Sequence, residues 1–231
     1  MSAIYQRFAA LSARFARSQP VCLHCFCDLT DGLSLTELLM GQDILCGFCR
    51  KQFVSCRKTI RVLDYEVYAY YEYEAFFEKL IFQVKENKDQ TLAPVFLYPY
   101  RKHLKKICEN KTIILVPSST KKTRQRGFDV LKCLYEGLGI ELLSPFEKDD
   151  VKQSGVHLRS RIKNHIRLVR PEMIQGKDVV LLDDVCTTGY SLKACIDLIK
   201  PLARSVNVVV LAAHTDNLKT RSPIKSDNSC K

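Results

Sequence analysis

The chain has 231 residues, of which 46% are hydrophobic and 26% are charged. That balance is typical of a globular protein with one ordinary domain and a small appendage, and no apolar run approaches the ~20 residues of a membrane helix. The formal net charge is +11, and residues 99–170 hold 17 Lys or Arg against 7 Asp or Glu. A positive field of this kind favours polyanions such as diphosphates or nucleic acids.

The first 19 residues are expected to form an amphipathic helix. Ile4, Phe8, Leu11 and Phe15 recur at helical spacing and share one face. Arginines are scattered through this segment, so it lacks the uninterrupted apolar stretch of a secretory signal. An Arg-rich, acid-free start is also a feature of transit peptides, but the amphipathic pattern favours the helix. We therefore expect a cytoplasmic protein, in which the 11 cysteines are metal ligands or inert thiols.

Residues 20–58 are rich in cysteine and predict a small zinc-binding module. Two Cys-x-x-Cys pairs, separated by a 20-residue loop, are formed by Cys22, Cys25, Cys46 and Cys49. Two such pairs supply the four thiolates of a tetrahedral structural Zn²⁺ site, with no open position for catalysis. Cys27 and Cys56 lie in the same segment, and either one is an alternative to one of the four ligands.

Residues 59–213 alternate strand-like and helix-like patterns. Buried or alternating strands are expected at residues 66–73, 112–116, 178–182 and 206–212, and helices at residues 75–84, 129–138 and 191–202. This alternation predicts an α/β domain with a mostly parallel central sheet, whose ligands bind at the carboxyl ends of the strands. The polar residues 214–231 are expected to be a disordered tail.

The most informative motif follows the expected strand at residues 178–182. Asp183 and Asp184 come at its carboxyl end, and a turn into a helix is formed by Thr187, Thr188, Gly189, Tyr190 and Ser191. Glycine permits a tight turn, and backbone N–H groups at a helix start bind phosphate. Two adjacent carboxylates accept hydrogen bonds from vicinal sugar hydroxyls, so this motif predicts a site for a phosphorylated ribose.

The same residues resemble the motif of type I phosphoribosyltransferases that binds 5-phosphoribosyl-1-pyrophosphate (PRPP). The resemblance implies that Asp183 and Asp184 are catalytic residues that contact the ribose hydroxyls. It also implies that Thr187 to Ser191 hold the 5′-phosphate. In that family Mg²⁺ accompanies the pyrophosphate, so magnesium with PRPP is the implied cofactor.

Further segments resemble the ComF family, a competence-associated group of phosphoribosyltransferase-like proteins. Residues 124–129, RQRGFD, are similar to its R-x-R-G-F-N segment, and residues 153–167 are similar to the stretch that follows it. The four-cysteine module and the aromatic residues 70–85 fit the same family. The implied fold is a type I phosphoribosyltransferase-like α/β domain with a small N-terminal zinc module.

Two groups of cations flank these motifs. A basic loop that can neutralise pyrophosphate is predicted at Ser118, Ser119, Lys121, Lys122, Arg124 and Arg126. A second group, which can contact nucleic acid, consists of Arg159, Arg161, Lys163 and Arg167. Both groups are also compatible with an ordinary solvated basic surface.

Two functions remain open from the sequence. One is a phosphoribosyltransferase that moves ribose 5-phosphate from PRPP to an acceptor that no segment identifies. The other, which we favour, is a competence protein that retains the PRPP pocket and binds single-stranded DNA beside a ComFA-type helicase, as the family resemblance implies. The tyrosines of residues 65–73 offer stacking surfaces for bases, although alternation favours a mixture of core and surface side chains.

Overall fold

The computed structural model describes residues 21–29, 43–148 and 166–214. Contacts divide the chain into two units, Met1–Lys51 and Gln52–Lys231. The division between the units thus comes a few residues before residue 58, at which the cysteine-rich sequence pattern ends. Strand β1, which belongs to the second unit, already begins at Ser55. The N-terminal helix and the tail beyond residue 214 lie outside the described residues. The same holds for Arg159, Arg161 and Lys163, so their expected structure and role stay predictions.

The described part of the first unit consists of two short turns and a helix. Val21 and Asp28 form an antiparallel bridge that closes the first turn. Helix α3, Gly47–Lys51, follows the second turn. Arg50 holds the start of this second turn, because its guanidinium pairs with Asp43 at 2.7 Å.

The second unit is built on a five-stranded sheet with the order β1-β2-β7-β6-β3. The strands are β1 (Ser55–Val62), β2 (Tyr65–Glu72), β3 (Thr112–Leu115), β6 (Asp178–Cys186) and β7 (Ser205–Ala213). β1 pairs antiparallel with β2, and the other three neighbouring pairs are parallel. The sheet is therefore mostly parallel, as the sequence predicts, with one antiparallel edge strand.

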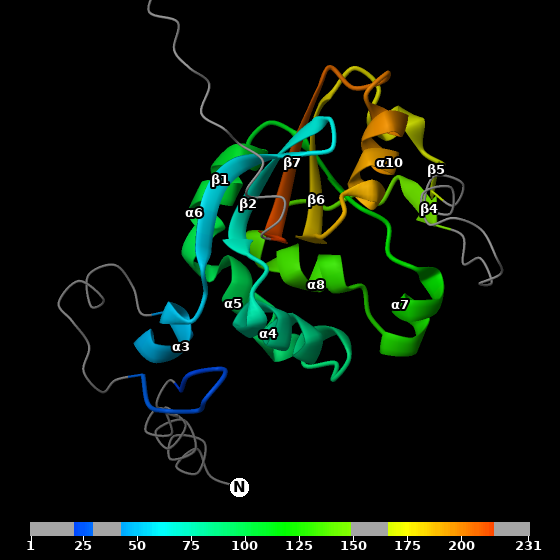
Figure 1. Ribbon diagram of the computed structural model, residues 1–231. Helices are drawn as coiled ribbons and strands as arrows, with labels where there is room; N and C mark the ends of the chain where they lie inside the picture. Colours follow the sequence, from blue (N-terminus) through cyan, green and yellow to red (C-terminus); the bar gives the residue numbers. More distant parts are fainter. Residues whose placement is uncertain (1–20, 30–42, 149–165, 215–231) are drawn as a thin grey trace, which may run out of the picture. The chain divides into compact units, whose positions relative to one another are not determined.

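Helices lie on both faces of this sheet. Figure 1 shows α6 and α10 on opposite sides of it, with α4 and α8 near the carboxyl ends of the strands. The helices are α4 (Ala75–Lys85), α5 (Pro94–Leu97), α6 (Arg101–Cys108), α7 (Thr120–Arg126), α8 (Val130–Tyr135) and α10 (Tyr190–Ile199). The side chains from Val179 to Leu182 are fully buried in β6. A strand covered on both faces reads as an unbroken apolar run, which is why the sequence revealed it.

Smaller elements complete the unit. A separate two-stranded sheet pairs β4, Phe146–Lys148, with β5, Ile166–Leu168. Short 3-10 turns occur at Gln90–Leu92, Tyr98–Tyr100, Glu136–Leu138 and Pro171–Met173. All seven strands and helices expected in residues 59–213 are present within a few residues of their predicted bounds.

The largest difference from the expected bounds concerns β6. The predicted strand ends at residue 182, whereas β6 continues through Asp183 and Asp184 to Cys186. The reason is the neighbouring strand β7, with which Asp183 pairs at Val210 and Cys186 pairs at Ala213. The two carboxylates are therefore carried by a strand end that is hydrogen-bonded, rather than by a free loop.

Candidate functional site

The acid pair at the end of β6 is held by backbone contacts. Asp183 Oδ1 accepts a hydrogen bond from the N–H of Asp184 at 2.9 Å, and Asp184 Oδ1 accepts one from the N–H of Val185 at 2.7 Å. The buried hydroxyl of Tyr135 on α8 donates to the carbonyl oxygen of Asp183 at 2.7 Å. Both carboxylates are half-buried, so they keep one orientation while remaining accessible to a ligand. Tyr135 was missed by the sequence analysis.

Lys85 is a second contact that the motif did not reveal. Its Nζ lies 2.6 Å from Asp184 Oδ2, and the two side chains are only 24% and 15% exposed. Lys85 is the last residue of α4, which follows directly after β2. An amphipathic helix that ends in lysine beside a sheet is common, so no sequence signal separated this cation from other surface lysines. The pair supplies Asp184 with a counterion.

Asp183 differs from its neighbour in its electrostatics. Burial and the charge of Asp184 together raise the pKa of the Asp183 carboxyl to about 7, against an opposing effect of Lys85 and Lys148. Two carboxylates this close resist double ionisation, because each disfavours the charge of the other. The site therefore contains one carboxylate paired with lysine and one carboxyl that titrates near neutral pH.

The turn after β6 has the geometry of an anion site. Thr187 and Thr188 are exposed, and Tyr190 and Ser191 are half-buried at the start of α10. Gly189 is the N-cap residue with φ +74°, and no side chain caps the helix there. The first N–H groups of an α-helix have no partner within the helix, and they lie where the helix dipole attracts negative charge.

Gly189 is required by space as well as by φ. A Cβ atom at this position would lie 2.3 Å from Cγ1 of Val62 on β1. The buried side chain of Val62 therefore presses directly on the turn. A residue with a side chain fits there only if Val62 shifts or the turn opens.

The predicted basic loop is a short helix rather than a loop. Ser118 precedes α7, and the Ser119 side chain caps the helix by accepting from the N–H of Lys122 at 3.3 Å. Lys121 and Arg124 are exposed on this helix. α7 then stops at Gly127, whose φ is +86°.

Two of the predicted cations line a small cavity with residues of α4 and the segment after it. The cavity has a volume of about 190 Å³ and is lined by Lys85, Glu86, Lys88, Lys122, Gln125 and Arg126. Arg126 is mostly buried and pairs with Glu86 at 2.6 Å. Since Lys85 also contacts Asp184, this cationic hollow lies next to the acid pair. Lys88 and Gln125 were not among the predicted site residues.

The RQRGFD segment has a structural explanation. Gly127 ends α7 in a left-handed conformation, and Asp129 caps α8 by accepting from the N–H groups of Leu131 and Lys132. Aspartate and asparagine are equally good N-cap residues. The substitution of Asp129 for the usual asparagine of the family segment is therefore conservative in structure.

The four predicted zinc ligands come together in the first unit. The sulfur atoms of Cys22, Cys25, Cys46 and Cys49 all lie within 4.8 Å of one another. Tetrahedral zinc with Zn–S bonds of ~2.3 Å requires sulfurs about 3.8 Å apart, so the donor set fits Zn²⁺. Burial opposes ionisation of Cys22, but backbone hydrogen bonds from Cys25, Cys46 and His24 lower the pKa of its thiol to about 6. The pKa of the Cys46 thiol is also lowered, against the effect of burial, by hydrogen bonds from the backbone of Cys49 and from neighbouring thiols, whereas burial raises the pKa of the Cys49 thiol.

The two alternative cysteines lie in different places. Cys27 is next to the cluster, with its sulfur 3.4 Å from that of Cys25. Hydrogen bonding with Cys25 and Cys46 raises the pKa of the Cys27 thiol to about 12, which keeps this thiol protonated. Cys56 belongs to β1 in the second unit, where burial raises the pKa of its thiol. Of the two, Cys27 is the one beside the four sulfurs.

Of the second cation group, only Arg167 lies in the described part of the chain. It is exposed on β5 and pairs with Glu147 of β4 at 3.6 Å. An exposed ion pair of this kind contributes little to stability. Arg167 therefore has a local partner, and the structure brings it no closer to a defined ligand site.

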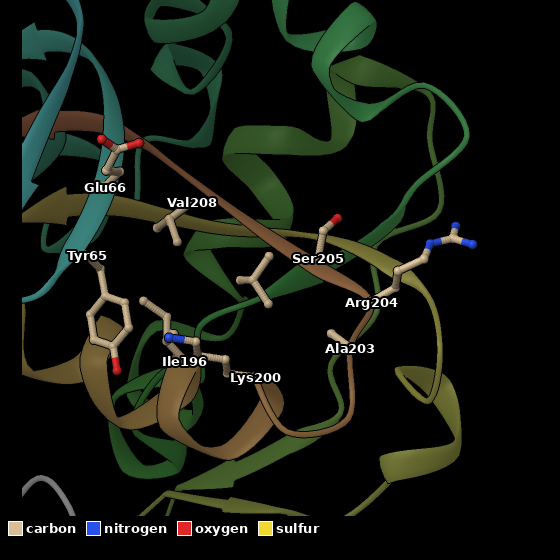
Figure 2. Close-up of a pocket in the computed structure, with 9 residues that line it drawn as sticks. Tyr65, Glu66, Ile196, Lys200, Ala203, Arg204, Ser205 and Val208 are labelled. Carbon is tan, nitrogen blue, oxygen red and sulfur yellow. The ribbon is translucent and has the colours of Figure 1, made fainter.

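A larger cavity occurs at the opposite end of the sheet. It has a volume of about 340 Å³ and lies between the C-terminal part of α10 and the first residues of β2 and β7. Figure 2 shows Lys200 and Tyr65 along one side of this cavity, and Arg204 directed away from it. Arg204 pairs instead with Asp178. Because ligands of parallel sheets bind at the carboxyl ends of the strands, we place the candidate site at the acid pair.

Comparison with known proteins defines the class first. The family model for the phosphoribosyl transferase domain matches residues 141–231, which include β6, the acid pair and the turn at Gly189. With the mostly parallel sheet, this match defines a type I phosphoribosyltransferase-like α/β fold. Among the described residues, no helix is long and apolar enough to cross a membrane.

A curated relative narrows the class. The chain is 27% identical to competence protein ComFC of Streptococcus pneumoniae over 197 residues, which are 74% of this chain and 89% of the relative. The chain is thus a ComFC-like protein with a phosphoribosyltransferase domain.

Similarity to solved structures is weaker. A hypoxanthine phosphoribosyltransferase of Staphylococcus aureus is 15% identical, with a TM-score of 0.37 over 59% of this chain and 71% of that chain. An adenine phosphoribosyltransferase of Saccharomyces cerevisiae is 18% identical, with a TM-score of 0.36 over 60% and 78% of the two chains.

Proposed function

We propose that the carboxyl end of β6 binds a ribose that carries a 5′-phosphate and a diphosphate, which is PRPP or a close relative. The observation that carries this proposal is the acid pair of Asp183 and Asp184 on a fixed strand end, followed by Gly189 and the uncapped start of α10. Ribose hydroxyls donate to the carboxylates, and the 5′-phosphate accepts from the N–H groups of the turn. The cationic hollow beside Lys85 lies where a diphosphate on the same ribose needs neutralisation.

Magnesium fits this arrangement as a companion of the ligand. Lys85 already neutralises Asp184, so the ion is expected to be held mainly by diphosphate oxygens. When bound, Mg²⁺ offsets the charge of the diphosphate as a leaving group. The chain itself orients the ribose through its two acids and holds the 5′-phosphate at the turn.

A second candidate is turnover as a phosphoribosyltransferase. The adjacency of the acid pair to the cationic hollow favours it, because an oxocarbenium-like transition state needs negative charge near the ribose and positive charge near the departing pyrophosphate. Positioning and charge stabilisation would then be the main contributions of the protein. Release of pyrophosphate from PRPP in the presence of candidate bases is the measurement that separates this candidate from binding alone.

The central test is a calorimetric titration with PRPP and magnesium. The wild-type chain is expected to bind, and Asp183→Asn/Asp184→Asn is expected to lose at least about 100-fold in affinity, because two hydrogen bonds to charged acceptors are removed. Asp178→Asn is the matched control, since Asp178 lies at the other end of the same strand and pairs with Arg204. The proposal is wrong if the wild-type chain gives no binding heat with PRPP or ribose 5-phosphate.

The same titration tests the role of Asp183 when it is repeated across pH. Because the pKa of the Asp183 carboxyl is about 7, its carboxylate form is lost as the pH falls through neutrality. Affinity for PRPP is therefore expected to rise between about pH 6 and pH 8. With Asp183→Asn the ligand phosphates titrate as before, so only the part of the pH dependence that the Asp183 carboxyl causes should disappear.

We also propose a cellular role like that of the curated relative, in competence and DNA uptake. The match to a protein named competence protein ComFC supports this role, and the net charge of +11 supports contact with a polyanion such as single-stranded DNA. A cytoplasmic location beside a ComFA-type helicase is part of the same proposal. Loss of transformation in a strain that carries the acid-pair variant would connect the pocket to this role.

We propose further that the four-cysteine cluster holds one structural zinc ion. Purified protein is expected to contain one zinc per chain by metal analysis. Cys22→Ser/Cys46→Ser should lose the metal and the fold of the first unit, because metal binding and folding are coupled in such modules. Cys27→Ser is the matched control, and it should retain the metal. Retention of zinc by the double variant, or its loss in Cys27→Ser, would assign the ligands differently.

A further inference from the structure

The elements β1 and α6 together carry a strong positive charge. Their sequences, SCRKTIRV and RKHLKKIC, contain seven Lys or Arg and no Asp or Glu. Arg57, Arg61 and Lys102 are all exposed. Two acidic residues of β2 lie near β1: Glu66 is opposite Arg61 in the register of the two strands, and Glu72 is close to Cys56. Seven cations therefore face two carboxylates from the neighbouring strand.

Aromatic rings lie between these cations. Tyr68 on β2 is half-buried, and its ring centroid lies 5.4 Å from that of the exposed His103 on α6. Buried Tyr70 fixes both rings, since its hydroxyl and His103 Nδ1 are 3.1 Å apart and its ring meets Tyr68 edge to face at 5.2 Å. The two accessible rings are therefore held in place by the core.

A third ring continues this arrangement. Tyr100 stacks on Tyr70 with ring centroids 4.6 Å apart and planes 17° from parallel. The guanidinium of Arg57 lies over the Tyr100 ring, 5.7 Å from its centroid. We call these rings and the exposed cations of the same elements the β1–α6 surface, defined by Arg57, Arg61, Tyr68, Tyr100, Lys102 and His103.

The β1–α6 surface is separate from the proposed phosphoribose site. Tyr68 and Tyr70 point to the face of the sheet on which α6 packs. Tyr65 lies three residues before Tyr68 on the same strand, so its side chain points to the opposite face of the sheet. There its hydroxyl donates a hydrogen bond to Asp197 of α10. Figure 1 shows these two helices on opposite sides of the sheet. The turn that starts α10 therefore belongs to the other face.

We propose that the β1–α6 surface binds single-stranded nucleic acid. Its cations neutralise phosphates, and the rings of Tyr68 and His103 stack with unpaired bases. A duplex matches this surface less well, because its bases are already stacked on one another. The inference gives a location to the DNA contact of the proposed cellular role, but it does not depend on PRPP binding.

The test is fluorescence anisotropy with a labelled oligothymidine strand, with each variant checked by thermal melting. Arg57→Gln/Lys102→Gln is expected to weaken binding about tenfold and to flatten its salt dependence. Tyr68→Leu should weaken binding about fivefold or more at an unchanged salt slope, whereas Tyr68→Phe keeps the ring and should bind as the wild type does. Lys177→Gln/Lys200→Gln removes two exposed cations elsewhere in the second unit and is the charge-matched control.

Three results would overturn the inference. The first is that the wild type binds the strand and that Arg57→Gln/Lys102→Gln and Tyr68→Leu bind it equally well. The second is competition by a duplex as effective as that by the unlabelled strand, which would mean that the rings do not contact bases. The third is no strand binding by the wild type, and binding of polyglutamate in that case would assign the surface to an acidic protein partner. The PRPP titration reports on the other site in every case.

Discussion

Gly189→Ala is expected to destabilise the second unit by about 3 kcal/mol and to abolish phosphoribose binding. About 1 kcal/mol arises from placing a side chain at φ +74°, and about 2 kcal/mol from the overlap of its Cβ with Val62. The overlap is relieved by a shift of Val62 on β1 or by opening of the turn. Opening of the turn displaces the N–H groups at the start of α10, so binding should be lost even where the variant remains folded. Urea unfolding and the PRPP titration measure the two effects.

Gly176→Ala separates strain from overlap. Gly176 also has a positive φ, +69°, but a Cβ there would meet nothing within 4 Å. This variant should therefore lose only about 1 kcal/mol and should bind PRPP normally. If Gly189→Ala is no less stable than Gly176→Ala, Val62 yields without cost and the close packing of β1 on the turn has no energetic role. If Gly189→Ala is the less stable of the two, the double variant Gly189→Ala/Val62→Ala should recover part of the lost stability, because it removes the overlap.

The sequence was most informative where burial imposes a pattern. The apolar run of residues 179–182 and the turn at Gly189 are local features, so the strand, the acid pair at its end and the turn into α10 were all predictable from them. β1 was missed because it is an edge strand in which half of the side chains are exposed and only Ile60 and Val62 are buried. Without a buried face on every second residue, the alternation that predicts a strand is weak.

The partners of the acid pair could not be predicted, because they come from distant parts of the chain. Lys85 reaches Asp184 only because α4 ends beside the carboxyl end of β6, and Tyr135 reaches Asp183 from α8. Such contacts depend on the packing of helices against the sheet and leave no local pattern. The extension of β6 through both acids has a similar origin, since β7 continues to pair with it as far as Ala213.

Lys85→Met is expected to weaken the binding of PRPP much more than the binding of ribose 5-phosphate. Lys85 lies 2.6 Å from Asp184 and also lines the cationic hollow with Lys88, Lys122 and Arg126. In the proposed site the 5′-phosphate binds at the Gly189 turn, so these cations are expected to neutralise the diphosphate. Loss of one charge-assisted hydrogen bond, about 1.5–3 kcal/mol, should weaken PRPP binding about 10- to 100-fold. Ribose 5-phosphate has no diphosphate, so its affinity should change by less than about threefold.

Lys79→Met is the matched control for this experiment. Lys79 is exposed on the same helix, so its loss changes the net charge equally without altering the hollow, and both affinities should stay at the wild-type values. An equal loss of affinity for both ligands in Lys85→Met would show instead that Lys85 acts only by keeping Asp184 in position. Binding of neither ligand to the wild type would reject the phosphoribose site itself, so the role of Lys85 and the identity of the site are tested separately.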